Sequence, residues 1–159
     1  MRITILAVGK IKEKYLSAGI AEFVKRLTPF CKLSIVELDE ERMPDNPSAA
    51  EKVQALTKEG ERVLKQVKDG TRLIVLDVAG KLISSEELSA NFDRLAVSGQ
   101  SDLTFVIGGA FGLSPDLVKA ADERISFSKM TFTHQMIRLL LVEQIYRAFK
   151  ISRGEKYHW

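Results

Sequence analysis

A long segment near the end of the chain, residues 126–150 with the sequence SFSKMTFTHQMIRLLLVEQIYRAFK, contains a predicted helix with almost no polar face. After a polar turn over residues 129–133, apolar side chains cover most directions around a predicted helix of about 18 residues. Arg138, Glu143 and Arg147 interrupt this helix, which favours burial in protein over a membrane span. A helix that is apolar nearly all round is buried on more than one side. One way to bury such a helix is to pack one side on its own core and another side on a second subunit.

The rest of the chain alternates predicted strands with predicted helices. Short, nearly continuous apolar runs are typical of buried strands, and they occur at residues 2–8, 32–38, 71–78, 103–107 and 124–128. Helical periods and capping signals, such as Ser84 followed by Glu87, predict helices at residues 15–27, 48–68, 84–97 and 115–122. This alternation predicts an α/β fold with a mostly parallel sheet and helices on both faces. No linker rich in Gly, Pro or Ser divides the chain, so residues 1–159 are predicted to form a single domain.

Composition narrows the classes of function. The 159 residues have a net charge of +3, which permits an anionic partner such as RNA without requiring one. The lone Cys31 excludes an internal disulfide and a cysteine-based metal site, and the two histidines are too few for a histidine-based metal site in one chain, so we expect no metal. The first residues lack the features of a signal peptide, which predicts a cytoplasmic protein with no membrane association.

Candidate chemistry lies where the predicted strands end, because ligands of parallel sheets bind beyond the carboxyl ends of the strands. The sharpest signal is the glycine cluster at residues 108–112, which fits a close approach to a ligand or a tight turn equally well. Lys10, Lys12 and Lys14 follow the first strand and fit either a solvated loop, as short charge runs usually are, or a patch facing phosphate. The GxGxxG, GxxxxGK[ST] and HExxH motifs are absent, which disfavours a Rossmann site, a P-loop and a zinc peptidase.

Two features near the end of the chain remain open on sequence grounds. His134 begins the final helix, where a histidine is most often structural. Residues 147–159 form a basic tail that ends in Tyr157, His158 and Trp159. Termini usually fray unless they dock. The aromatic residues therefore favour a tail that packs on another surface or closes over a site, where such rings can also stack on bases.

Several segments taken together resemble one family closely. They are LAVGKIKEKY at residues 6–15, VLDVAGKLISSEEL at residues 75–88, FVIGGAFGLSPD at residues 105–116, SFSKMTFTHQMIRLLLVEQIYRAFKI at residues 126–151, and the final YH pair. The family comprises the bacterial enzymes that methylate N3 of a pseudouridine in large-subunit ribosomal RNA, within the SPOUT methyltransferase superfamily. The resemblance covers essentially the full length of the chain.

The resemblance implies a C-terminal trefoil knot, a homodimer, and an assembled ribosome as the substrate. It also implies S-adenosylmethionine as the cofactor, held near the subunit interface by three backbone loops. The chain departs from the family pattern at Thr133, where proline is usual, and at Trp159, where a basic residue is common. Thr133 can still cap the helix, whereas Trp159 removes a terminal positive charge. The residues that match the cofactor loops are Leu76, Gly108, Phe127, Ser128, Lys129, Met130, Thr131 and Phe132.

For such a transfer the enzyme must hold donor and acceptor in near-attack geometry and help the N3–H lose its proton. The candidate proton handlers are His158 and Tyr157, in the site of either subunit, with His134 as the second choice. The candidates for contact with RNA phosphate are Arg138, Arg153 and Lys156.

Two alternatives remain on sequence grounds. One is a non-catalytic RNA-binding or ribosome-binding module on the same fold. The other is a phosphate-binding enzyme of flavodoxin-like build that uses Lys10 and Lys12. Binding of S-adenosylmethionine separates the first alternative from the methyltransferase hypothesis.

Overall fold

The computed structural model of the protein describes residues 1–157, and its centre is a five-stranded sheet. All registered strand pairs in this part of the chain are parallel, which confirms the predicted fold class. The strands follow the order β2-β1-β4-β3-β5 across the sheet. Their bounds are β1 Arg2–Val8, β2 Lys32–Leu38, β3 Arg72–Leu82, β4 Asp102–Ile107 and β5 Glu123–Ser126.

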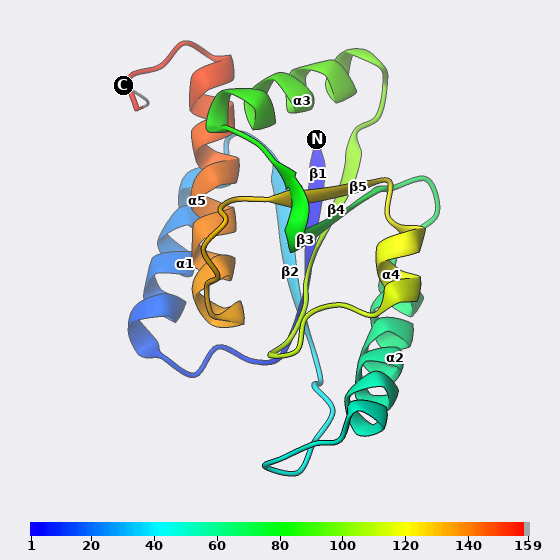
Figure 1. The fold of residues 1–159 in the computed structure, drawn as a ribbon. Coiled ribbons are helices and arrows are strands. Elements are labelled where there is room, and N and C mark those ends of the chain that lie inside the picture. The colour runs from blue at the N-terminus through cyan, green and yellow to red at the C-terminus, as the bar shows by residue number, and fades with distance from the viewer. Residues whose placement is uncertain (158–159) are drawn as a thin grey trace.

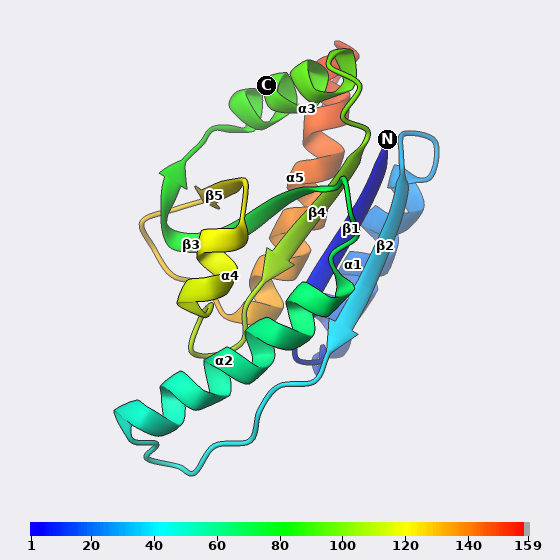
Figure 2. The same ribbon diagram turned by 90° about the vertical axis from the view of Figure 1, so that its right-hand side faces the viewer.

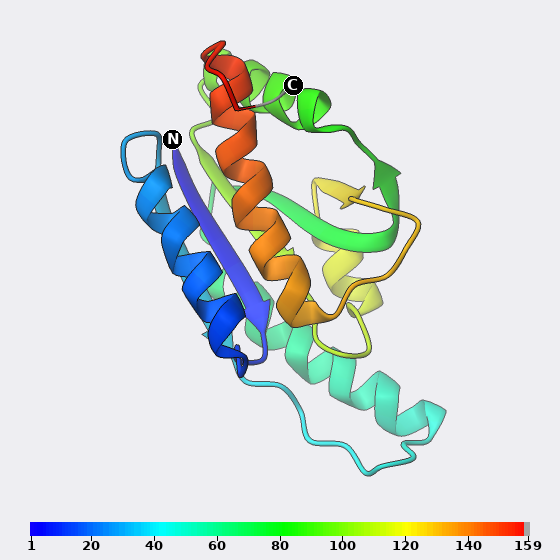
Figure 3. The same ribbon diagram turned by 90° about the vertical axis from the view of Figure 1, so that its left-hand side faces the viewer.

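Helices cover both faces of this sheet, as predicted. Helices α1, α3 and α5 lie on one face (Figures 1 and 3), and α2 and α4 lie on the other (Figure 2). Ser48, Ser84 and Ser114 cap α2, α3 and α4 as expected from the sequence. The helix bounds are α1 Lys14–Leu27, α2 Ala49–Gln66, α3 Ser85–Val97, α4 Pro115–Ala120 and α5 His134–Ser152.

The continuous apolar run of β1 follows from its central place in the sheet. Ile3, Ile5 and Ala7 belong to the core under α1, α3 and α5. Leu6 and Val8 point to the opposite face and pack with residues of α2 and α4. Because successive side chains of a strand point to opposite faces, a strand covered on both sides needs apolar residues at every position.

Helix α5 is the apolar helix singled out in the sequence, and it packs between α1 and α3. Leu141, Val142 and Ile145 are fully buried against the sheet. The packing of another side of α5 against a second subunit stays a prediction. No helix among residues 1–157 is long and apolar enough to cross a membrane.

The predicted turn at residues 79–81 is wrong. Strand β3 continues to Leu82 and crosses β5, with a shift in register between Leu76 and Lys81. Gly80 permits this crossing, since a Cβ at that position would lie 2.6 Å from the carbonyl carbon of Ile125. The small residues at 79 and 80 therefore lie at a bend within β3, where it passes close to β5, and do not mark the end of the strand (Figure 3). The trefoil knot stays a prediction.

Gly60 explains how α2 and α4 pack so closely. A Cβ at this position would overlap Oγ of Ser114 and would lie 3.1 Å from its Cβ. The same Oγ accepts a hydrogen bond from the backbone N–H of Leu117 at 3.2 Å and so caps α4. The side chain of Ser114 therefore cannot rotate away from a new methyl group without losing the cap.

Replacing Gly60 with Ala should destabilise the protein even though Ala is the better helix former. Overpacking costs about 1–3 kcal/mol and a lost cap about 1 kcal/mol, against about 1 kcal/mol gained in helix propensity. We expect a net loss of about 1–3 kcal/mol in the free energy of unfolding, measured by urea denaturation. Lys58→Ala, on an exposed position of the same helix, is the control and should change it by less than about 0.5 kcal/mol. A Gly60→Ala protein as stable as the unaltered chain would contradict the packing argument.

Candidate functional site

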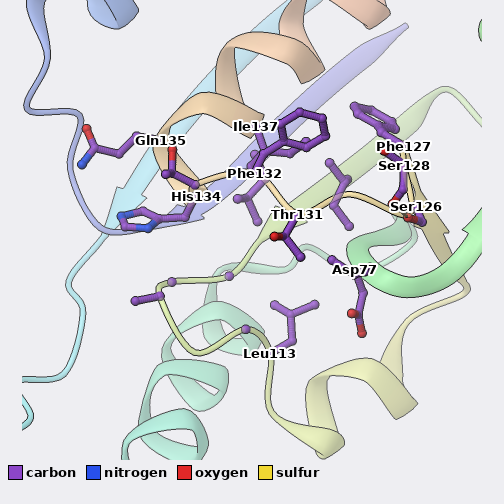
Figure 4. Close-up of a pocket in the computed structure, with 18 of the residues that line it drawn as sticks. Asp77, Leu113, Ser126, Phe127, Ser128, Thr131, Phe132, His134, Gln135 and Ile137 are labelled. Carbon is purple, nitrogen blue, oxygen red and sulfur yellow. Dashed lines mark hydrogen bonds between the residues drawn. The ribbon is translucent and has the colours of Figure 1, made fainter. Parts of the chain in front are cut away.

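A cavity of about 740 Å³ opens at the carboxyl edge of the sheet, beside residues 76–78 of β3 and the ends of β4 and β5 (Figure 4). The three backbone loops that the resemblance assigns to the cofactor all contribute to its wall. Lys129 is not among the lining residues. Of the expected cofactor residues, those that line the cavity are Leu76, Gly108, Phe127, Ser128, Met130, Thr131 and Phe132.

The glycine cluster after β4 forms a tight turn, as one interpretation of the sequence predicted, and this turn is also one wall of the cavity. The close approach to a ligand stays a prediction. The backbone N–H of Gly112 donates to the carbonyl oxygen of Gly109 at 3.1 Å. Gly112 has a φ of 88°, a conformation that favours glycine. A Cβ on Gly108 would overlap the carbonyl oxygen of Gly112 and lie 2.7 Å from its carbonyl carbon. The turn can therefore close in this form only because residue 108 has no side chain.

The loop between β5 and α5 is held in shape by its own side chains. Oγ of Ser126 donates to the carbonyl oxygen of Ser128 at 2.9 Å, and Oγ of Ser128 accepts from the backbone N–H of Met130 at 2.9 Å. Thr133 ends the loop as the N-cap of α5, where its Oγ1 accepts from the N–H of Met136 at 3.1 Å. The threonine in place of the family's proline therefore keeps the junction of loop and helix, as expected.

The cavity is also lined by residues outside the expected cofactor set. In Figure 4, His134 and Gln135 lie at one side of the pocket, and Asp77 lies at the other. Oδ2 of Asp77 accepts a hydrogen bond from Nε of Arg124 at 2.8 Å, so its carboxylate is partly neutralised. Tyr15 in the first turn of α1 also lines the cavity. The position of Asp77 directly after Leu76, at a predicted strand end, was a usable signal for this residue.

His134 lies at the pocket wall, over the end of β1. Its Nε2 is 3.3 Å from the place that a Cβ on Gly9 would take. Partial burial is the main reason that the pKa of His134 is lowered, and Arg138 and Lys12 add to this effect while Glu40 opposes it. The imidazole is therefore neutral at pH 7 and able to accept a proton.

The expectation that Arg138 meets RNA phosphate is wrong for the described chain. Its side chain is only 1% exposed. Nη1 of Arg138 donates to Oε2 of Glu37 at 2.6 Å, and Nη2 donates to the carbonyl oxygen of Gly9 at 3.0 Å. The guanidinium therefore ties α5 to the ends of β1 and β2. A buried arginine needs a partner for its charge, and here that partner is Glu37, which lies 101 residues away in the sequence and is itself 41% exposed.

The described part of the basic tail, residues 147–157, consists of the end of α5 and the turn after it, and it does not line the cavity of its own chain. The last turn of α5 is at the opposite end of the molecule from the Gly108 loop (Figure 1). The guanidinium of Arg153 lies 4.3 Å from the ring centre of Phe30, and Lys156 is exposed. His158 and Trp159 lie outside the described residues, so the roles expected for them stay predictions.

Tyr157 is docked in this arrangement. Its hydroxyl donates to Oε1 of Glu143 at 3.0 Å, and its ring meets that of Tyr146 edge-on at 4.9 Å. Burial, followed by the hydrogen bond to Glu143, raises the pKa of Tyr157. The phenol is therefore protonated at neutral pH, and it serves as a hydrogen-bond donor in this position rather than as a base. Within residues 1–157 there is no cluster of three side chains suited to hold a metal ion.

The protonation of His134 can be measured directly by NMR titration of its Cε1–H signal, with a His134→Gln variant to assign it. We expect a midpoint below the ordinary value of about 6.5. Because the folded state disfavours the charged ring, the contribution of His134 to stability is complete above that value and declines as the pH falls through the lowered pKa. A midpoint at or above about 6.5 would contradict the burial described here.

The sequence of this chain is similar to that of known methyltransferases over nearly its whole length. Residues 1–158 match the family model described as "Predicted SPOUT methyltransferase". The chain is 55% identical over 157 residues to "Ribosomal RNA large subunit methyltransferase H" of Pelotomaculum thermopropionicum, covering 99% of this chain and 98% of that protein. It is 54% identical over 158 residues to the protein of the same name from Acetivibrio thermocellus, covering 99% of each.

Solved structures of lower identity agree in fold. A probable methyltransferase from Bordetella pertussis Tohama I superposes with a TM-score of 0.54 at 17% identity, covering 93% of this chain and 95% of that chain. A probable methylase family protein from Haemophilus influenzae Rd KW20 gives a TM-score of 0.52 at 15% identity, covering 99% of this chain and 70% of that chain. At these identities the likeness concerns the fold alone. The match to the family over nearly the whole chain, together with relatives that share more than half of its residues, shows that this chain belongs to the SPOUT methyltransferase family.

Proposed function

We propose that this protein is an enzyme that transfers a methyl group from S-adenosylmethionine to large-subunit ribosomal RNA. Membership of the SPOUT methyltransferase family implies the use of this cofactor. One observation supports the proposal above the others: residues from three separate segments, expected to hold the cofactor, line one cavity at the carboxyl edge of the sheet. The relatives named as ribosomal RNA large subunit methyltransferases support RNA as the acceptor.

The finer assignment is N3 of a pseudouridine in the assembled ribosome, acted on by a cytoplasmic homodimer. It rests on the segments that resemble the pseudouridine-N3 methyltransferases, including the Gly108 loop and the stretch at residues 126–151. A chain of 159 residues with a net charge of +3 has only a small excess of positive charge. Recognition therefore depends on the folded shape of the substrate more than on a short RNA sequence.

The residues of the pocket fit S-adenosylmethionine. Main-chain groups of the loops that contain Leu76, Gly108 and Phe127 to Phe132 offer hydrogen-bond donors and acceptors to its adenine and methionine parts. Apolar side chains of Ile107, Leu113 and Ile125 line the same cavity and suit the adenine ring. The bound cofactor supplies an activated methyl group on a sulfonium. The chain itself must hold the acceptor in line with that group and exclude water.

Proton handling is the second requirement, because the N3–H of the acceptor is a weak acid. His134 is the described pocket residue best suited to accept that proton, since its ring is neutral at pH 7 and lies at the pocket wall. His158 and Tyr157 remain candidates through the tail of the partner subunit. Arg153 and Lys156 remain candidates for phosphate contacts, because both are exposed.

The proposed activity is tested with large ribosomal subunits from cells that lack this protein and S-adenosylmethionine with a tritiated methyl group. We expect one methyl group per subunit, located by mass spectrometry at N3 of a pseudouridine. Gly108→Ala should weaken cofactor binding between about 5-fold and 150-fold, because its Cβ overlaps the closed turn. Calorimetric titration with the cofactor measures this loss.

Gly70→Ala is the matched control for the glycine variant. Gly70 also has a positive φ, but it lies in a remote turn with open space around it, so its replacement should affect stability and not cofactor affinity. Normal cofactor binding by the Gly108→Ala protein would reject the assigned pocket. Absence of cofactor binding by the unaltered protein would instead favour a non-catalytic RNA-binding module.

The tail is tested with mixed dimers, because the described part of the tail does not line the pocket of its own chain. His158→Ala alone should lower turnover by about 100-fold or more, as expected for loss of a proton handler, and should leave cofactor affinity unchanged. A dimer of one His158→Ala subunit and one Gly108→Ala subunit then has one intact pocket and one intact tail, on different chains. At a cofactor concentration well below the weakened Kd of the Gly108→Ala pocket, we expect this mixed dimer to recover activity if the tail acts on the partner's pocket. A tail that serves its own pocket leaves the mixed dimer with the low activity of the single variants.

A further inference from the structure

One part of the pocket lining lies outside the loops that are expected to hold the cofactor, and we call this part the second wall. The loops that contain Leu76, Gly108 and residues 127–132 form one part of the lining. The other part comes from the first turns of α1 and α5. The second wall consists of Glu13, Tyr15, Leu16, His134, Gln135 and Ile137.

Tyr15 is the aromatic residue of this second wall. It is 63% exposed, more than any other exposed aromatic residue among residues 1–157. Its neighbour Leu16 is buried and anchors the first turn of α1 in the core. In the described chain no hydrogen bond, ion pair or ring contact involves the side chain of Tyr15. When a flat ligand stacks on an exposed aromatic ring at the mouth of a pocket, apolar surface is removed from water, and this favours binding.

The segment that precedes Tyr15 is fixed in place before any ligand binds. The backbone N–H of Ile11 donates to Oε2 of Glu37 at 3.0 Å, and the same oxygen accepts from Nη1 of the buried Arg138. The backbone N–H of Lys12 donates to Oε1 of Gln135 at 2.9 Å. Residues 9–12 are therefore tied to β2 and to the first two turns of α5. Because the segment before Tyr15 is already fixed, less conformational entropy is lost when a ligand binds to the ring.

The same segment bears positive charge toward solvent. Lys10, Lys12 and Lys14 are all exposed, against the single acid Glu13. An exposed aromatic ring beside several cations is the combination with which proteins bind unpaired nucleotides, through stacking on the base and attraction to the phosphates. The exposed ring of Tyr15 beside these lysines therefore supports the interpretation that they face phosphate.

Resting on the proposed function, we infer that Tyr15 stacks on the base of the target nucleotide and holds it against the methyl donor, with Lys10 and Lys14 beside the flanking phosphates. The base enters between the second wall and the cofactor loops. This places the acceptor next to His134, the described residue best able to take its proton. Tyr15 thus positions the RNA substrate and does not bind the cofactor.

The test compares Tyr15→Ala, Tyr15→Phe and Tyr15→Trp in methyl transfer to large ribosomal subunits. We expect Tyr15→Ala to lower kcat/KM between about 5-fold and 100-fold, and Phe and Trp to keep most of it, because they retain the stacking surface. Cofactor affinity, measured by calorimetry, should be unchanged in all three. Val97→Ala is the control, since Val97 is an apolar residue of α3 that is 90% exposed and lies outside the pocket lining.

Two outcomes would overturn the assignment. Equal kcat/KM for Tyr15→Ala and the unaltered protein would show that the ring does not meet the substrate. A loss of cofactor affinity that matches the loss of kcat/KM would place the ring in the cofactor subsite. Both results require an unaltered protein that methylates ribosomes, so failure of this inference is distinct from failure of the proposed function.

The lysines provide an independent arm of the test. Replacing Lys10 and Lys14 with Gln should reduce the dependence of KM on salt concentration, because fewer phosphate contacts release fewer counterions. Lys65→Gln, on an exposed position of α2 outside the pocket lining, is the matched control and should leave the salt dependence as it is. If the dependence of KM on salt concentration is unchanged in the double variant, Lys10 and Lys14 do not contact the phosphates of the substrate.

Discussion

The burial of α5 against the sheet is the constraint on which the rest of the structure depends. Leu141, Val142 and Ile145 are fully buried, and the helix lies between α1 and α3. Burial of three such side chains contributes roughly 5–9 kcal/mol. A helix held along the sheet in this way must begin at its carboxyl edge. That start brings His134, Gln135 and the loop before them to the glycine turn after β4.

A half-buried ion pair, between buried Arg138 and exposed Glu37, fixes the same helix at its polar positions. Arg138 would be a costly residue inside an apolar helix without Glu37 and the carbonyl oxygen of Gly9. Removing Glu37 would leave the buried guanidinium with the carbonyl oxygen of Gly9 as its partner, and screening by solvent at the exposed carboxylate reduces the cost below that of a fully buried pair. The pair also sets the position of the segment after β1. Helix packing and pocket shape are therefore linked through one side chain.

The sequence was sufficient for the layered fold, because its apolar runs and capping residues are local signals. The carboxyl ends of the strands were a sound guide to the pocket, and the glycine cluster lies in its wall. Arg138 could not be placed, since nothing near it in the chain indicates a partner on β2. Tyr15 gave no signal either, because an aromatic residue that begins a helix looks the same whether it faces a pocket or open solvent. The extension of β3 past residue 78 was hidden by small residues that usually mark turns.

The order of the strands leaves the sheet with two very different borders. β5 forms one border with four residues, and the loop that follows it turns into the pocket wall. β2 forms the other border, where Lys32, Ser34 and Glu37 alternate with apolar residues. A very short outer strand and an outer strand interrupted by charge both discourage pairing with a further strand from another chain. The sheet is thereby protected against edge-to-edge aggregation, and its carboxyl ends remain free for a ligand.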